Sequence, residues 1–296
     1  MSSEPRSGPQ AALIQAEYPL YWPETIRALL VHSAEWTEPM QRAFDDEVPK
    51  LVPKDKLRRR LRRYGYGIPS LDRARYSARN SLTLIAQQAL RPFEKEGSEI
   101  KTGQMGLHSL PWPKDLLFEL GETKVEMRVT LSYFIEPKPG RRGGFSRTRH
   151  RYQSHGLRFE VRRPGESLDQ FRQRVNNAAR AEEEGEYGGN AGEPIGWVLG
   201  PKLRTRGSIH SDWWQGTAAD LADCGEIAVF PVSGWWRDKS DQDHWSREAR
   251  YSLVVSIQTA ATTVDLYLPV HAMIEVPVPQ TIVTEIQLED NFDDLF

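Results

Sequence analysis

The sequence predicts an α+β protein in which N-terminal helices precede an antiparallel β-sandwich or jelly-roll-like domain with one inserted helix. Apolar residues repeat at helical spacing in the first third of the chain, and from Lys124 the hydrophobic period switches to two. A length of 296 residues with 39% hydrophobic and 27% charged residues is typical of a globular protein with a substantial core. We therefore expect a helical region over 1–100, a sandwich over 101–280 and an acidic tail over 281–296.

Four segments of the N-terminal region predict helices. The second of them opens at Trp22-Pro23, where proline at the first helical position loses no hydrogen bond, and Ile26, Leu29 and Leu30 form a stripe that indicates one buried face. The predicted helices cover residues 11–17, the segment from Pro23, residues 51–63 and residues 79–90.

Alternation of apolar and polar residues predicts the strands that follow. Val125–Ile135 alternates with polar residues such as Arg128 and Thr130, which predicts a long, half-buried strand. Ser167 and Gln170 form a capping box, which predicts that a helix starts here. Further strands are expected over residues 157–161, 227–232, 251–257 and 264–270.

The composition makes several classes of function unfavourable. No apolar run approaches the roughly 18 residues of a membrane span, and the start of the chain is polar, so we expect neither a membrane protein nor a secretory signal. The lone Cys224 excludes an internal disulfide and a cysteine-based zinc site, which favours the cytoplasm. The net charge of -2 argues against general nucleic-acid binding, although the basic runs 54–63 and 141–151 leave it as a weaker alternative.

No motif predicts a cofactor or a metal. The sequence has neither the dinucleotide fingerprint nor the phosphate loop, and His108, His150 and His155 have no further ligand at metal-binding spacing. We therefore expect no cofactor, no bound metal and no catalytic residue that acts through either.

Two short segments resemble hydrolase motifs. His210, Ser211 and Asp212 stand side by side, but adjacent side chains diverge and cannot form a nucleophile–base–carboxylate relay, so we expect them to bond the local backbone instead. The segment 216–219, Gly-Thr-Ala-Ala, resembles a serine-peptidase nucleophile motif with alanine in place of the nucleophile, and it cannot attack a carbonyl.

Tryptophan gathers in one part of the chain, because six of the nine lie between Trp197 and Trp245. One member of each Trp-Trp pair is expected to fill the core while the other covers an interface between domains. Stacking on a ligand or sugar, and a hot spot for a partner protein, are the alternatives. The candidate interaction surface consists of His210, Asp212, Trp213, Trp214, Trp235 and Trp236.

The N-terminal helices carry a family resemblance. Residues 11–19, AALIQAEYP, and 22–34, WPETIRALLVHSA, resemble the end of the catalytic domain of a subtilisin-like serine peptidase, a subtilase. In that family a buried helix leads on from the catalytic serine, and a helix of the type P-x-x-(I/V)-R-x-x-L follows. Pro23, Ile26, Arg27 and Leu30 hold those positions here.

Later segments resemble the C-terminal extension of a bacterial intracellular branch of subtilases. The resemblance implies that residues 1–100 contain the remnant of the peptidase domain, and that the partner is a peptidase domain or an AAA-type ATPase, with which members of that branch are often paired. The segments are 63–69, 125–135, 207–212, 234–236 and 250–257.

This sequence departs from the family at the reaction centre. Subtilases supply Asp, His and Ser on a parallel sheet that precedes these helices, and residues 1–10 do not spell Gly-Thr-Ser. We therefore expect the C-terminal region of a subtilisin-like serine endopeptidase that supports the peptidase domain and is inactive by itself. The alternative is a free-standing protein-binding sandwich module. The acidic tail is expected to be solvated, with a docking peptide as the alternative.

Overall fold

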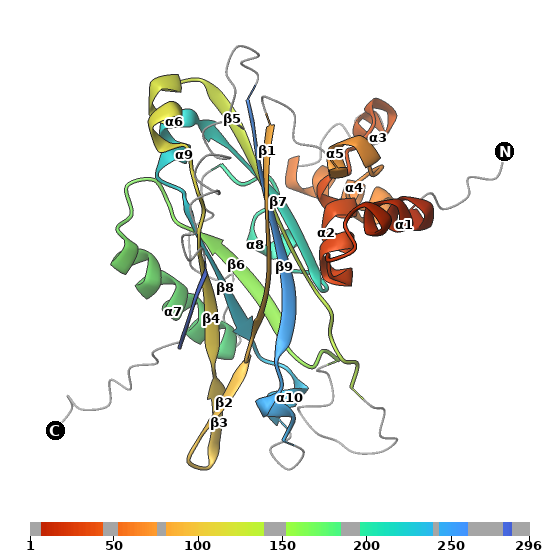
Figure 1. The fold of residues 1–296 in the computed structure, drawn as a ribbon. Coiled ribbons are helices and arrows are strands. Elements are labelled where there is room, and N and C mark those ends of the chain that lie inside the picture. The colour runs from red at the N-terminus through yellow and green to blue at the C-terminus, as the bar shows by residue number, and fades with distance from the viewer. Residues whose placement is uncertain are drawn as a thin grey trace.

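Two β-sheets face each other, and helices cover the outer face of each (Figure 1). The computed structural model describes residues 7–43, 53–75, 81–138, 152–184, 196–238, 243–259 and 281–285. The fold is α+β with antiparallel strand pairing throughout these residues, which confirms the predicted class.

The first sheet has the order β1-β9-β5-β7 and the second the order β10-β4-β8-β6, while β2 and β3 form a separate hairpin. Apart from that hairpin, successive strands alternate between the two sheets, so each connection crosses from one sheet to the other. The strands are β1 (Ser81–Leu90), β2 (Phe93–Glu96), β3 (Glu99–Thr102), β4 (Gln104–Ser109), β5 (Lys124–Tyr133), β6 (Gly156–Val161), β7 (Ile209–Thr217), β8 (Glu226–Val232), β9 (Ala249–Thr259) and β10 (Thr281–Glu285).

The main core lies between the sheets. Met127 of β5, Phe159 of β6 and Val229 of β8 are at most 1% exposed and belong to one apolar cluster. Burial of such side chains contributes about 1.5–3 kcal/mol each, so this inter-sheet layer supplies much of the stabilising free energy.

Helices cover both outer faces. In Figure 1, α1 and α2 lie on the side of the first sheet and α7 lies beside the second. Ile26 of α2 packs with Val254 of β9, and Phe171 of α7 packs with Phe230 of β8. The helices are α1 (Ser7–Glu17), α2 (Pro23–His32), α3 (Glu38–Arg42), α4 (Pro53–Tyr64), α5 (Leu71–Arg75), α6 (Lys114–Leu120), α7 (Leu168–Glu184), α8 (Pro201–Arg204), α9 (Ala218–Ala222), α10 (Trp235–Asp238) and the 3-10 helix η3 (His244–Ser246).

Most of the predicted elements are present. The inserted helix is α7, and its capping box is formed as expected: the amide of Gln170 donates to the Ser167 hydroxyl at 3.2 Å, and the amide of Ser167 donates to the Gln170 side chain at 2.9 Å. The strands predicted over 125–135, 157–161, 227–232 and 251–257 correspond to β5, β6, β8 and β9. The strand predicted over 264–270 lies outside the described residues.

The helix predicted over 79–90 is wrong, because residues 81–90 form β1 and pair with β9. Leu84 and Ala86 of this strand pack in the inter-sheet core, whereas Ile85 packs under the N-terminal helices. A strand that is covered on both faces carries apolar residues on both, so it shows no simple alternation. In β1 the apolar residues of the two faces together match the spacing expected for a helix.

The prediction of a half-buried β5 is wrong for the same reason. Arg128, Thr130 and Ser132 occupy the face that was expected to meet solvent, yet each is at most 3% exposed, because α2 lies across it. Residues 281–285 of the expected acidic tail form β10 beside β4, and the rest of that tail lies outside the described residues.

Candidate functional site

Five of the six residues of the candidate interaction surface are buried. His210, Asp212 and Trp214 of β7 are at most 7% exposed, as are Trp235 and Trp236 of α10. Trp213 keeps partial exposure. The six side chains therefore do not form one exposed patch, and contact with a partner stays a prediction that depends on Trp213.

Asp212 organises the backbone around it rather than taking part in a relay. Its carboxylate accepts hydrogen bonds from the amides of Leu199 at 2.8 Å, Gly200 at 2.9 Å and Trp213 at 2.8 Å. The Arg204 guanidinium lies 3.6 Å from the same carboxylate. Burial raises the pKa of Asp212, while Arg204 and the three amides act in the opposite direction. This agrees with the expectation that polar groups of this segment bond local backbone.

Trp213 covers the junction between the N-terminal helices and the first sheet. Its ring lies 5.4 Å from that of Trp36 and 6.3 Å from that of Tyr66, and the Arg128 guanidinium lies 4.3 Å from its centroid. Trp214, its neighbour, points to the other face of β7 and belongs to the inter-sheet core. The pair is thus divided between core and junction.

Helix α2 meets the sheet through polar side chains. The Arg27 guanidinium donates to the Ser132 hydroxyl at 2.9 Å and to the carbonyls of Tyr133 and Ser208. Two residues earlier, the Thr25 hydroxyl donates to the Gln87 side-chain oxygen at 2.7 Å. Such directional contacts fix the position of the helix on the sheet more narrowly than apolar packing alone.

Arg128 holds the C-terminal end of α2 from the sheet side. Its guanidinium donates to the carbonyls of Val31 at 2.8 Å, His32 at 2.5 Å and Ala34 at 2.8 Å. The last carbonyls of a helix have no partner within the helix, and a buried cation satisfies both their hydrogen bonds and the negative end of the helix dipole. Burial lowers the pKa of Arg128 to about 9, so the group stays charged at neutral pH.

His32 and Ser256 form a pair that superficially resembles a nucleophile and its base. His32 Nε2 lies 2.8 Å from the Ser256 hydroxyl, while Nδ1 lies 2.9 Å from the Thr130 hydroxyl, so no carboxylate orients the ring. Both residues are at most 7% exposed. Burial and the nearby Arg128 charge lower the pKa of His32 well below its ordinary value, which makes it a poor base. The pair joins α2 to β5 and β9.

The opposite side of the helical layer is apolar and exposed. Leu13 of α1 is 53% exposed and Leu20, just after α1, is 86% exposed. A groove of about 390 Å³ lies between α1 and α2, with Ala11, Ile26 and Leu30 among its walls together with Arg27. Scattered apolar residues are normal on a surface, but a contiguous apolar face marks a contact site.

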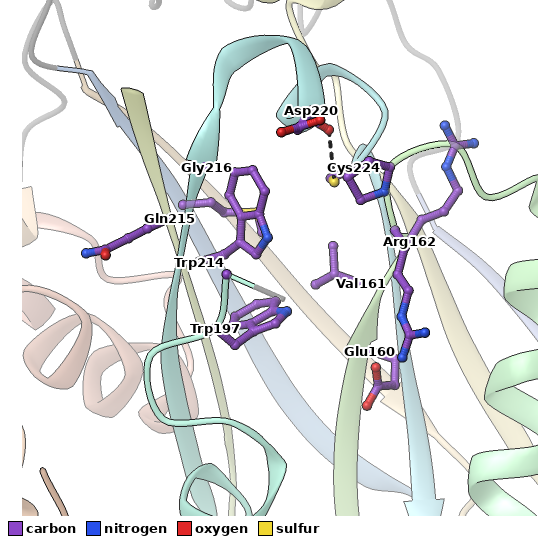
Figure 2. Close-up of a pocket in the computed structure, with 13 residues that line it drawn as sticks. Glu160, Val161, Arg162, Trp197, Trp214, Gln215, Gly216, Asp220 and Cys224 are labelled. Atoms are coloured by element: carbon purple, nitrogen blue, oxygen red, sulfur yellow. Dashed lines mark hydrogen bonds between the residues drawn. The ribbon is translucent and has the colours of Figure 1, made fainter. Parts of the chain in front are cut away.

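A larger pocket of about 610 Å³ opens where the edge strands β6 and β7 meet (Figure 2). Trp197 and Trp214 form one wall, Val161 lies opposite them, and Cys224 lies at the far end. The Cys224 thiol donates to the carbonyl of Asp220 at 3.3 Å, and burial raises its pKa to about 12. The thiol is therefore neutral and not a nucleophile at physiological pH.

Neither a metal site nor a membrane span is found in the described part of the chain. Among these residues no group of three or more His, Cys, Asp or Glu side chains is placed to hold a metal ion. None of the described helices is both long enough and apolar enough to cross a membrane. In the segment 216–219, which resembles a nucleophile motif, Thr217 has a structural role. Its hydroxyl caps α9 by accepting a hydrogen bond from the amide of Asp220.

Comparison of the chain with family models, with curated proteins and with solved structures gave no match.

Sequence reasoning missed two parts of these sites. Arg128 was assigned to a solvent-facing position, although the short hydroxyl side chains of Thr130 and Ser132 beside it are a signal that the face is covered. The pocket was missed because Trp197 and Trp214 come together only through an isolated bridge between their two segments. The spacing of residues along the sequence does not predict that bridge.

Proposed function

We propose that this protein is the C-terminal region of a subtilisin-like serine endopeptidase, whose sandwich holds the final helices of the peptidase domain in place. In this proposal the chain is inactive by itself, works in the cytoplasm and has a protein partner, either the peptidase domain or an AAA-type ATPase. A cytoplasmic setting is in keeping with the single Cys224, whose thiol is free.

The contacts of α2 carry the proposal. The segment that resembles a subtilase helix directs its polar residues towards the sandwich: Thr25, Arg27 and His32 each bond a residue of the first sheet. Glu24 is 3% exposed and pairs with Arg250 of β9 at 3.2 Å. These buried polar contacts give the helix one defined position, which suits a support element.

The remaining side of α1 and α2 is suited to a second body. Leu13 and Leu20 are exposed apolar side chains, and the groove between α1 and α2 has the apolar walls Ala11 and Leu30 and one charged residue, Arg27. The α/β catalytic domain of a subtilase is the occupant that the resemblance implies for this face. The polar residues of α2 would then bind the helix to the sandwich, while the apolar residues of α1 and α2 would pack against the core of the peptidase domain.

The test begins with the DNA upstream of residue 1, which under this proposal encodes a parallel sheet ending in Gly-Thr-Ser in frame. A polypeptide in which this upstream sequence is joined to residues 1–296, called here the joined polypeptide, is expected to react with a fluorophosphonate probe. The chain of 296 residues alone is expected not to react. A labelled 296-residue chain would contradict the inactive state. An upstream region without such a sequence, in frame or frameshifted, would contradict the family assignment and favour the free-standing binding module.

A matched pair of variants tests the apolar face. In the joined polypeptide, Leu13→Glu is expected to reduce probe labelling at least tenfold, because a carboxylate buried at an apolar contact costs several kcal/mol. Leu168→Glu is the control, since Leu168 on α7 is also exposed but lies on the other side of the sandwich. Equal labelling of the two variants would show that α1 does not contact the peptidase domain.

A further inference from the structure

The pocket between β6 and β7 contains hydrogen-bond donors that the protein does not use. Trp214 is 7% exposed, yet within the described part of the chain its indole N–H has no acceptor, and the same holds for Trp197. Figure 2 shows the nitrogen atoms of both rings on the side that faces β6 across the pocket. Neither nitrogen is among the fully buried polar atoms that lack a partner, so each N–H is accessible to solvent and free to donate to a bound acceptor.

Two glycines make room for the Trp214 ring in this position. A Cβ atom on Gly216 would collide with the far edge of the Trp214 ring, and a Cβ atom on Gly196 would lie 2.6 Å from its indole nitrogen. Gly196 also has a φ of +90°, which favours glycine. The backbone around the ring therefore has room for it in the observed orientation because both positions lack a side chain.

Three charged residues of the pocket, Glu160, Arg162 and Asp220, have partners within the protein, whereas Arg163, which also lines the pocket, is exposed. Glu160 accepts from Arg174 at 2.9 Å and from Arg204 at 3.2 Å, and Arg162 pairs with Glu226 at 3.0 Å. The neutral thiol at the far end adds no charge. A ligand with a net charge would therefore gain little from these paired groups and would lose its hydration.

We propose that this pocket binds a neutral apolar group that carries an amide carbonyl, with the carbonyl oxygen accepting from the indole N–H groups of Trp197 and Trp214. The volume of about 610 Å³ is in the range of small-molecule sites. Val161 and Met127 supply apolar contacts for the body of the ligand. The same chemistry occurs in a small acyl amide and in an apolar residue within a longer peptide.

The test uses N-acetyl-phenylalaninamide as the probe and follows the tryptophan indole N–H signals in a 1H–15N correlation spectrum. Two of the nine indole signals are expected to shift saturably, and the variants Trp197→Phe and Trp214→Phe assign them. Each variant keeps an apolar ring but loses one neutral hydrogen bond, so each is expected to weaken binding about fivefold. Trp197→Phe is the primary variant because Trp197 is less buried than Trp214.

Three comparisons make the result decisive. Trp245→Phe is the matched control, because Trp245 of η3 donates to Asp243 away from the pocket, and it is expected to bind the probe as tightly as the unaltered chain. N-acetyl-phenylalanine, which carries a carboxylate, is expected to bind more weakly than the amide. A blocked Gly-Gly-Phe-Gly-Gly peptide distinguishes the two sources, since tighter binding than the small amide assigns the site to peptides and weaker binding to small amides.

Any one of three outcomes would overturn the proposal. The first is the absence of any saturable shift of an indole signal at millimolar probe. The second is binding that is unchanged in both Trp197→Phe and Trp214→Phe. The third is tighter binding of the carboxylate than of the amide.

Discussion

Replacing Arg128 by methionine tests whether a buried cation holds α2 on the sheet. The substitution leaves the carbonyls of Val31, His32 and Ala34 without their donor. Each unpaired buried carbonyl costs about 1–3 kcal/mol. Burial of the charged guanidinium is itself unfavourable and lowers the pKa of Arg128 to about 9. Methionine carries no charge to bury, so the substitution regains part of the lost stability. We expect the free energy of unfolding to fall by about 3 kcal/mol.

Urea denaturation measures the change in stability, and hydrogen exchange of the α2 amides shows where it acts. Exchange in α2 is expected to accelerate more than exchange in α7, because the substitution frees one end of α2 only. Arg163→Met is the control, since Arg163 is exposed and its loss should change stability by less than about 0.5 kcal/mol. A loss below about 1 kcal/mol in Arg128→Met, with α2 exchange unchanged, would refute the reasoning.

Three further outcomes are expected. Burial lowers the pKa of His108 from 6.5 to about 4, so the unfolded chain binds the proton more readily than the folded chain. The free energy of unfolding is therefore expected to fall as the pH drops from about 6.5 to 4, and denaturation at these pH values should show a smaller fall in His108→Gln. Gly67→Ala should lower the melting temperature more than Gly65→Ala, because both have positive φ but only at Gly67 would a Cβ atom collide with the Glu35 carbonyl. Cys224 should react with an aromatic disulfide reagent about a thousandfold more slowly in the native chain than after denaturation, since burial raises its pKa from 9.0 to about 12.

The sequence predicted those elements whose pattern is set locally. The capping box at Ser167 specifies the start of α7 because both its partners lie within one turn. Alternation specifies β5 and β6, and short apolar segments between turn signals specify β8 and β9. In these cases the neighbours along the chain determine the outcome.

The remainder depended on contacts that spacing does not encode. β1 was taken for a helix because α2 covers its outer face, which made both faces apolar. The same coverage placed Arg128 beneath a helix instead of in solvent. His210 and Asp212 are buried on the other face of the sheet, where they pair with Leu131 and Val129 of the inter-sheet core. The division of Trp213 and Trp214 between junction and core followed from strand geometry, whereas the pocket around Trp197 required two distant segments to meet.

The central position of β9 has a consequence for synthesis of the protein. β9 pairs with β1 on one side and with β5 on the other, so two strands encoded early stay apart until Thr259 has left the ribosome. Such non-local pairing is intrinsically slow. During that interval the edges of β1 and β5 that will pair with β9 lack their partner.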